Sequence, residues 1–188
     1  MKNVLLFLTI VVFSIPGFAQ GVFSNQTNFV LEKVVQEYTS QFRNIRGEII
    51  NKSKASTAYK STLAIPGAVS TTITQTIAED RQVLAWETVL YTGPDFNTAK
   101  ARYETLFNQI KNTIIKPAGE KPLIVNGLYL NPSADKNLNT IQFDLLPANS
   151  SLQKVNIDLV LQHEAGKWQI VLSVADKGRT EAGGIVIK

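Results

Sequence analysis

Apolar side chains recur at helical spacing in two stretches of the chain. In the first, over residues 28–46, they stand three or four positions apart, and Gly47 follows where a helix C-cap is expected. The second, over residues 96–114, comes directly after Gly93-Pro94-Asp95, a group typical of a helix start. Both stretches therefore predict amphipathic helices that each bury one face.

Between and after these helices, apolar and polar residues alternate, as in β-strands with one solvated face. The predicted strands cover residues 59–65, 68–77, 82–91, 123–130, 140–146, 155–162 and 168–175. The run 82–91 carries apolar residues on both faces, which predicts a central strand. Gly166 offers a positive φ for a hairpin between the last two strands. The order αβββ-αββββ predicts an α+β fold, with two helices packed on a largely antiparallel sheet of six to seven strands.

An internal repeat relates the two predicted helices. Residues 38–50 align without gaps on residues 103–115, so that a tyrosine, a phenylalanine and three isoleucines recur. The match predicts a duplicated helix-plus-strands unit. The alternative is that two amphipathic helices acquired the same core residues independently.

The N-terminus has the pattern of a cleaved signal peptide over residues 1–19. Lys2 supplies the positive charge, a run of about twelve apolar residues follows, and Gly17 and Ala19 place small residues at the cleavage site. An uncleaved anchor is the alternative, although the run is shorter than the roughly twenty residues that span a bilayer. We then expect a short lead-in over residues 20–27, a single domain over 28–176 and a tail or edge strand over 177–188.

The amino-acid composition excludes several kinds of functional site and partner. The chain has no cysteine, which excludes disulfides, thiol nucleophiles and thiolate metal sites. The net charge of +4 comes without a basic run interleaved with aromatics, so we expect no nucleic-acid partner. The element order and the export signal resemble those of small periplasmic proteins of Gram-negative bacteria, which implies a periplasmic or extracellular location.

The sequence lacks the residue sets of the common catalytic centres. His163 is the one histidine, and Lys167 stands where a zinc-protease motif needs a second. Serine hydrolysis of the usual kind needs a histidine base. Gly183-Gly184 lacks the context of a phosphate loop. We therefore predict no metal, no cofactor and no catalytic residue.

Three carboxylates, Glu87, Asp144 and Asp158, are the remaining candidates for a catalytic role. Glu87 shares a predicted strand face with apolar residues, so it either needs a polar partner or lies at the sheet margin in water. Asp144 and Asp158 lie on neighbouring predicted strands, in a register that brings Gln142 near Asp158. That arrangement is typical of a solvated sheet face.

These observations favour an exported, non-enzymatic binding or protein-interaction module, with an exported or envelope protein as partner. The candidate binding residues are Glu87, Trp86, Trp168, Arg43, Arg46, Lys52, Lys54 and Lys60. One alternative is a hydrolase that uses only carboxylates, from Glu87, Asp144 and Asp158. Another is a carrier that holds a small apolar ligand between sheet and helices, around Trp86 and Trp168.

Overall fold

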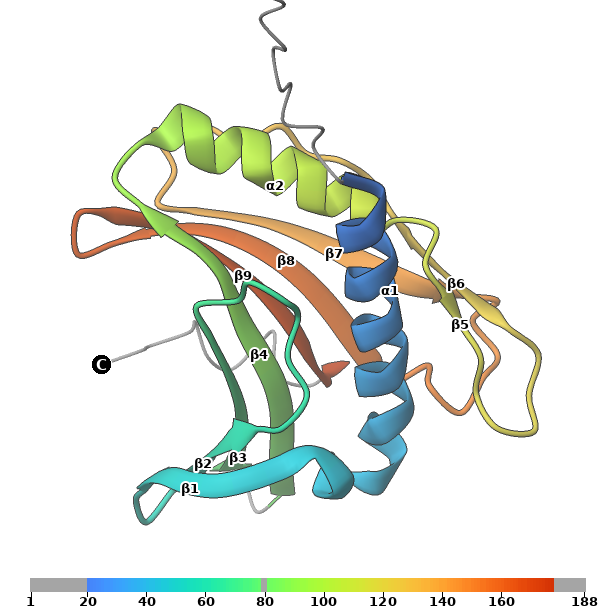
Figure 1. Cartoon of the computed structure of the whole chain (residues 1–188). Helices are drawn as coiled ribbons and strands as arrows, with labels where there is room; N and C mark the ends of the chain where they lie inside the picture. Colours follow the sequence, from blue (N-terminus) through green and yellow to red (C-terminus); the bar gives the residue numbers. More distant parts are fainter. Residues whose placement is uncertain (1–19, 79–80, 178–188) are drawn as a thin grey trace, which may run out of the picture.

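A computed structural model describes residues 20–78 and 81–177, which form two helices and nine strands (Figure 1). The elements are α1 (Gln20–Glu37), β1 (Arg46–Lys52), β2 (Ser56–Ser61), β3 (Ser70–Ala78), β4 (Arg81–Gly93), α2 (Phe96–Ile110), β5 (Ile114–Ile115), β6 (Leu123–Gly127), β7 (Leu138–Leu146), β8 (Val155–Glu164) and β9 (Lys167–Asp176). The predicted signal peptide and residues 178–188 of the predicted tail lie outside the described residues. No helix within the described ranges is long and apolar enough to cross a membrane.

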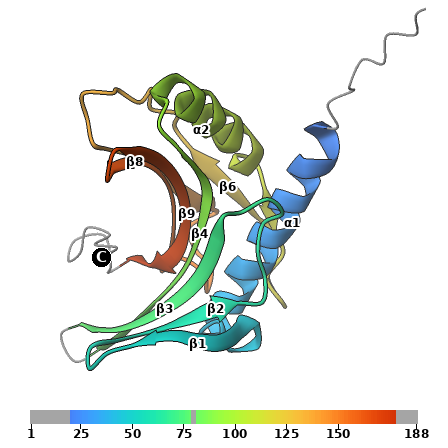
Figure 2. The ribbon, with the colours of Figure 1, turned by 60° about the vertical axis from the view of Figure 1, so that its left-hand side comes forward.

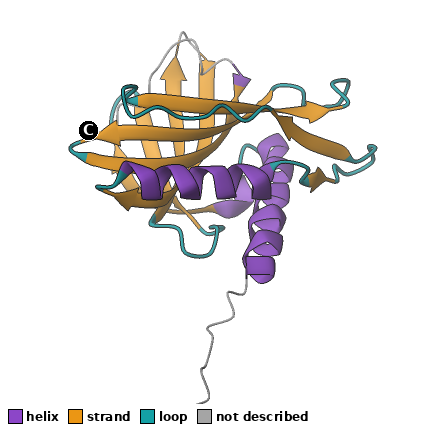
Figure 3. Ribbon diagram, turned by 90° about the horizontal axis from the view of Figure 1, so that it is seen from above, coloured by secondary structure: helices purple, strands orange, loops and turns teal. Residues whose placement is uncertain are grey.

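All nine strands belong to one antiparallel sheet in the order β1-β2-β3-β4-β9-β8-β7-β6-β5. Each helix is followed by a meander of strands, and the two meanders meet where β4 pairs with β9. The sheet is strongly curved, with both helices on its convex side (Figure 2). A view from above shows the helices together against one side of the strands (Figure 3). We call that side the helix-covered face and the concave side the helix-free face.

The sheet is larger than the sequence predicts. Two helices on an antiparallel sheet are confirmed, but nine strands replace the predicted six to seven. β1 was missed because it is an edge strand whose residues are mostly exposed, so burial imposes no clear alternation on it. β5 was missed because it has two residues.

The first helix differs from its prediction at both ends. It begins at Gln20, inside the predicted lead-in, and ends at Glu37 rather than at Arg46. The chain then makes two short 3₁₀ turns, with Gln41 and Phe42 in the left-handed region between them. Phe42 and Ile45 are nevertheless buried. Their helical spacing therefore reflects burial in a turn segment and not a continuing helix.

The two copies of the repeat consequently have different local structures. Residues 38–50 form the 3₁₀ turns and most of β1, whereas residues 103–115 form the end of α2 and β5. Phe42 and Phe107 occupy equivalent positions of the repeat and both are buried. The order of elements, a helix and four strands followed by a helix and five strands, agrees with two related halves.

The core lies between the helices and the covered face of the sheet. α2 starts as predicted, because the Asp95 side chain accepts a hydrogen bond from the Thr98 N–H at 2.7 Å. Tyr103 of α2 is fully buried between the helix and the sheet, and its hydroxyl donates a hydrogen bond to the Leu159 carbonyl of β8 at 2.9 Å. This contact ties the helix to the centre of the sheet.

Candidate functional site

A row of polar side chains crosses the middle of the helix-free face. Strand register places one polar residue on each of six adjacent strands, so that every member lies opposite the next. In sheet order from β2 to β7, these residues are Lys60, Thr72, Glu87, Ser173, Asp158 and Gln142. We call this set the polar row. Because directly opposed residues in antiparallel strands share a face, the row is continuous across the sheet.

Alternation along each strand keeps the polar row on the face away from the helices. Asp158 lies between Ile157 and Leu159, which both belong to the core cluster on the helix-covered face. Ser173 lies likewise between the core residues Leu172 and Val174. Successive side chains of a strand point to opposite sides of a sheet. The row therefore belongs to the concave side seen in Figure 2.

Apolar side chains surround the centre of the polar row. Val160 and Val171 lie two residues along their strands from Asp158 and Ser173, on the same face, and are 4% and 1% exposed. Ala175, on the other side of Ser173, is also buried. This setting removes water from the Asp158 carboxyl and raises its pKa from 3.8 to about 6, despite a hydrogen bond from Asn156 that acts in the opposite direction.

A chain of amide hydrogen bonds fixes one side of Asp158. The Gln142 amide donates to the Asn156 side-chain oxygen at 2.5 Å, and the Asn156 amide donates to Oδ2 of Asp158 at 2.5 Å. The other carboxylate oxygen, Oδ1, is buried and has no hydrogen-bond partner within the part of the chain that the structure describes. A buried acceptor without a donor is costly, so this oxygen is the strongest sign of a ligand on this face.

The charge along the polar row is predominantly negative. Glu87 and Asp158 carry two carboxylates on β4 and β8, with the Ser173 hydroxyl between them on β9. Lys60 is the single cation of the row, and its ammonium lies 3.8 Å from a Glu48 carboxylate oxygen. The centre of this face therefore has a charge opposite to the chain's net charge of +4.

Two of the three carboxylates weighed for hydrolysis come together in the polar row. Neighbouring strands lie about 4.8 Å apart, so the Glu87 and Asp158 backbones are roughly 9–10 Å apart, with β9 between them. The predicted register of Gln142 opposite Asp158 is confirmed. Asp144 lies outside the row, opposite Asn126, with one carboxylate oxygen 3.9 Å from the Lys177 ammonium.

The predicted basic residues do not form one surface. Arg46 begins β1 and Lys52 ends it, which separates them by about 20 Å along the strand. The Arg46 guanidinium lies 5.1 Å from the centre of the Tyr59 ring and donates to the Gln75 side chain. Lys54 lies in the connection between β1 and β2, and Arg43 belongs to the second 3₁₀ turn. Lys60 alone reaches the polar row.

The two tryptophans lie on the helix-covered face, far from one another. Trp86 is fully buried, and its indole N–H lies 3.2 Å from both the Ser61 hydroxyl and the Leu63 carbonyl. Trp168 packs against Phe96 with ring centres 4.9 Å apart. Trp86 is opposite Val174 on β9, six residues from Trp168, which corresponds to about 20 Å. The pair therefore does not frame a single ligand site.

His163 lies near the end of β8 and not in the turn itself. It is opposite Trp168, and the two rings are 4.7 Å apart. Ala165 and Gly166 form the turn with φ of 49° and 74°, so the predicted positive φ at Gly166 is confirmed. No group of three or more His, Cys, Asp or Glu side chains in the described ranges is arranged to hold a metal ion.

Two members of the polar row, Thr72 and Ser173, were missed from the sequence, and both lie directly opposite Glu87. Each alternates correctly with core residues, so its face was readable from the sequence. What the sequence did not contain was the pairing of β4 with β9, which joins Glu87 to Ser173 across 86 residues of chain. No model of a protein family matches the chain, and searches of curated proteins and of solved structures return no match.

Proposed function

We propose that the protein is an exported, non-enzymatic binding module whose helix-free face binds a cationic segment of an exported or envelope protein. One observation carries this proposal. Asp158 is held half-buried at the centre of the polar row, with Oδ1 lacking a donor among the described residues. A carboxylate in this half-buried position, with one oxygen unpaired, lowers the stability of the fold. Functional sites commonly contain residues that lower stability in this way.

Charge complementarity identifies the ligand chemistry. An amino or guanidinium group supplies an N–H donor to the unpaired Asp158 oxygen and a positive charge between Asp158 and Glu87. A charge-assisted hydrogen bond of this kind is about twice as strong as one between neutral groups. Because the chain as a whole has a charge of +4, long-range attraction does not favour a cationic partner. Binding must therefore arise locally, in the polar row.

The length of the row suits an extended peptide. Six strands with spacings of about 4.8 Å give a row roughly 24 Å long from β2 to β7. About seven residues of extended chain cover that distance. The exposed ends of the row, Lys60 and Gln142, leave room for such a segment to continue beyond the central carboxylates.

The proposal is tested by calorimetry with N-acetyl-triarginine amide as the probe. Residues 20–188 should bind this peptide, and Asp158→Asn and Glu87→Gln should each weaken binding about tenfold or more, because each removes a charge-assisted contact. Asp144→Asn is the matched control, since it neutralises a carboxylate on the same face but outside the row.

The control should bind within twofold of the wild type, and N-acetyl-triglutamate amide should not bind. If the wild type fails to bind triarginine, or if Asp144→Asn weakens binding as much as Asp158→Asn, the proposal is wrong.

A carboxylate-only hydrolase is the second candidate, favoured by the placement of Glu87 and Asp158 on either side of Ser173. Carboxyl groups about 6.5–9.5 Å apart are typical of inverting glycosidases, in which an acid of raised pKa protonates the leaving group. The raised pKa of Asp158 would assign it the acid role and Glu87 the base role. Hydrolysis of aryl glycosides by the wild type, lost in both Glu87→Gln and Asp158→Asn, would favour this alternative.

A further inference from the structure

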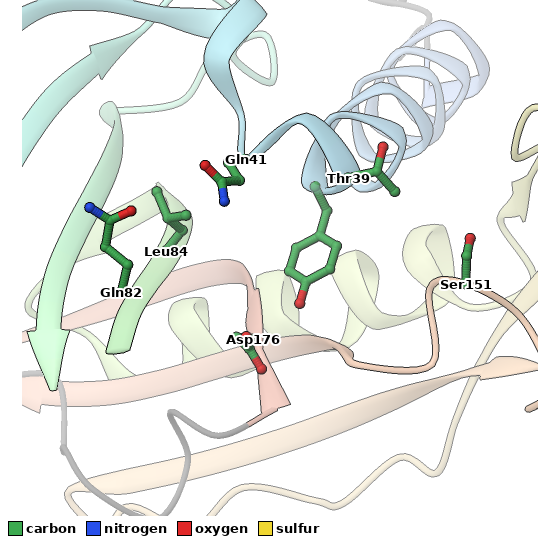
Figure 4. Close-up of a pocket in the computed structure, with 7 residues that line it drawn as sticks. Thr39, Gln41, Gln82, Leu84, Ser151 and Asp176 are labelled. Carbon is green, nitrogen blue, oxygen red and sulfur yellow. The ribbon is translucent and has the colours of Figure 1, made fainter. Parts of the chain in front are cut away.

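A cavity lies on the helix-covered side of the sheet, beside the segment that follows α1. It has a volume of about 380 Å³. One wall is formed by Tyr38, Thr39 and Gln41, and the opposite wall by the ends of β4 and β9 (Figure 4). None of the lining residues belongs to the polar row. The cavity is therefore a separate site from the one on the helix-free face.

The wall that contains Gln41 is held in an unusual backbone conformation. Gln41 and Phe42 have φ of 58° and 57°, a region that residues other than glycine seldom adopt. The fully buried Phe42 side chain anchors this turn. Arg46 donates to the Gln41 carbonyl at 2.6 Å, and Arg43 donates to the Gln41 side-chain oxygen at 3.1 Å. Such conformations persist where surrounding contacts fix them, and they concentrate at ligand sites.

Tyr38 and Asp176 meet at the base of the cavity. The Tyr38 hydroxyl donates a hydrogen bond to the Asp176 carboxylate, and both side chains line the cavity. Burial and the nearby carboxylate raise the pKa of Tyr38 to about 12, so the hydroxyl stays protonated. The pair joins the turn after α1 to the end of β9.

We infer that this cavity binds a neutral, hydroxyl-rich ligand the size of a mono- or disaccharide. The lining offers the hydroxyls of Thr39 and Ser151 and the amides of Gln41 and Gln82, and it contains no lysine or arginine. These groups can both donate to and accept from sugar hydroxyls. Leu84 and the Tyr38 ring supply apolar surface for the carbon–hydrogen side of a sugar ring. The volume is near the lower end of the range for ligand pockets, about 300–1,000 Å³.

The inference is tested by saturation-transfer NMR on residues 20–188 with glucose, galactose, N-acetylglucosamine and maltose. At least one of these sugars should bind, and Asp176→Asn and Tyr38→Phe should each weaken its binding at least tenfold, because both remove a fixed polar group of the cavity. Ser151→Ala removes an exposed hydroxyl, so it tests the same site without disturbing the fold. It should weaken binding about threefold.

The variants Asp158→Asn and Glu87→Gln are the controls, since they change the helix-free face and should leave sugar binding unaltered. Triarginine binding by these two variants tests the helix-free face alone. Failure of the proposed function is therefore distinguishable from failure of the sugar-binding inference. The inference is overturned if no sugar of the panel binds the wild type. It is also overturned if binding persists unchanged in both Asp176→Asn and Ser151→Ala.

Discussion

Replacing Tyr103 with alanine is expected to lower the free energy of unfolding by about 3–5 kcal/mol. The side chain is fully buried where α2 packs on the sheet, so truncation leaves a cavity that the surrounding strands cannot fill. Its hydroxyl lies 2.9 Å from the Leu159 carbonyl and 3.3 Å from the Asn139 carbonyl, and both carbonyls lose this donor. Urea denaturation followed by circular dichroism measures the loss.

Two further variants separate packing from hydrogen bonding. Tyr103→Phe keeps the ring and removes the hydroxyl, so it should cost about 1 kcal/mol. Tyr38 occupies the equivalent position of the internal repeat but is only half-buried, and Tyr38→Ala should also cost about 1 kcal/mol. A Tyr38→Ala variant as unstable as Tyr103→Ala would contradict this description of the core.

Replacing Asp158 with asparagine is expected to stabilise the protein at pH 7 by about 2 kcal/mol. The unfolded carboxyl loses its proton above about pH 4, whereas the folded one keeps it until about pH 6. Between these values the unfolded state binds fewer protons, so the wild type loses stability as the pH rises. Asparagine does not titrate and still accepts the hydrogen bond from Asn156.

The stability gained by Asp158→Asn should therefore increase as the pH rises from about 4 to about 6. Urea denaturation at pH 3.5, 5 and 7 should show no difference at the lowest pH and the full difference at the highest. Asp144→Asn is the matched control, because Asp144 is exposed beside Lys177 and should show no such gain. Equal stability of Asp158→Asn and the wild type at pH 7 would contradict this account, because it would show that the ionised Asp158 carboxylate does not destabilise the fold.

Periodicity predicted the elements whose two faces differ most. β7 alternates between exposed and buried residues, and most of it was located from the sequence together with the register of Gln142 against Asp158. The limits of periodicity show at Phe42 and Ile45, where buried residues at helical spacing belong to 3₁₀ turns. An apolar pattern reports which residues are buried, and a turn can bury them as well as a helix does.

The candidate site was predicted less well than the fold, for a topological reason. Glu87 and Asp158 were each singled out, but their relation depends on β9 lying between β4 and β8. Strand order is set by packing of the whole sheet and leaves no local signal in any one segment. The basic residues from Arg43 to Lys60 show the opposite effect of the fold. They are close in sequence, but β1 and β2 hold them apart in space.

The central claim is that the Asp158 carboxylate binds a cationic group on the helix-free face, and its titration tests this most directly. Carbon-13 NMR of the aspartate carboxyls follows Asp158 in the free protein and with saturating N-acetyl-triarginine amide. We predict a pKa of about 6 in the free protein, and a lower pKa when a guanidinium group lies beside the carboxylate. A pKa near 4 in the free protein, or a pKa that the peptide leaves unchanged, would contradict the claim.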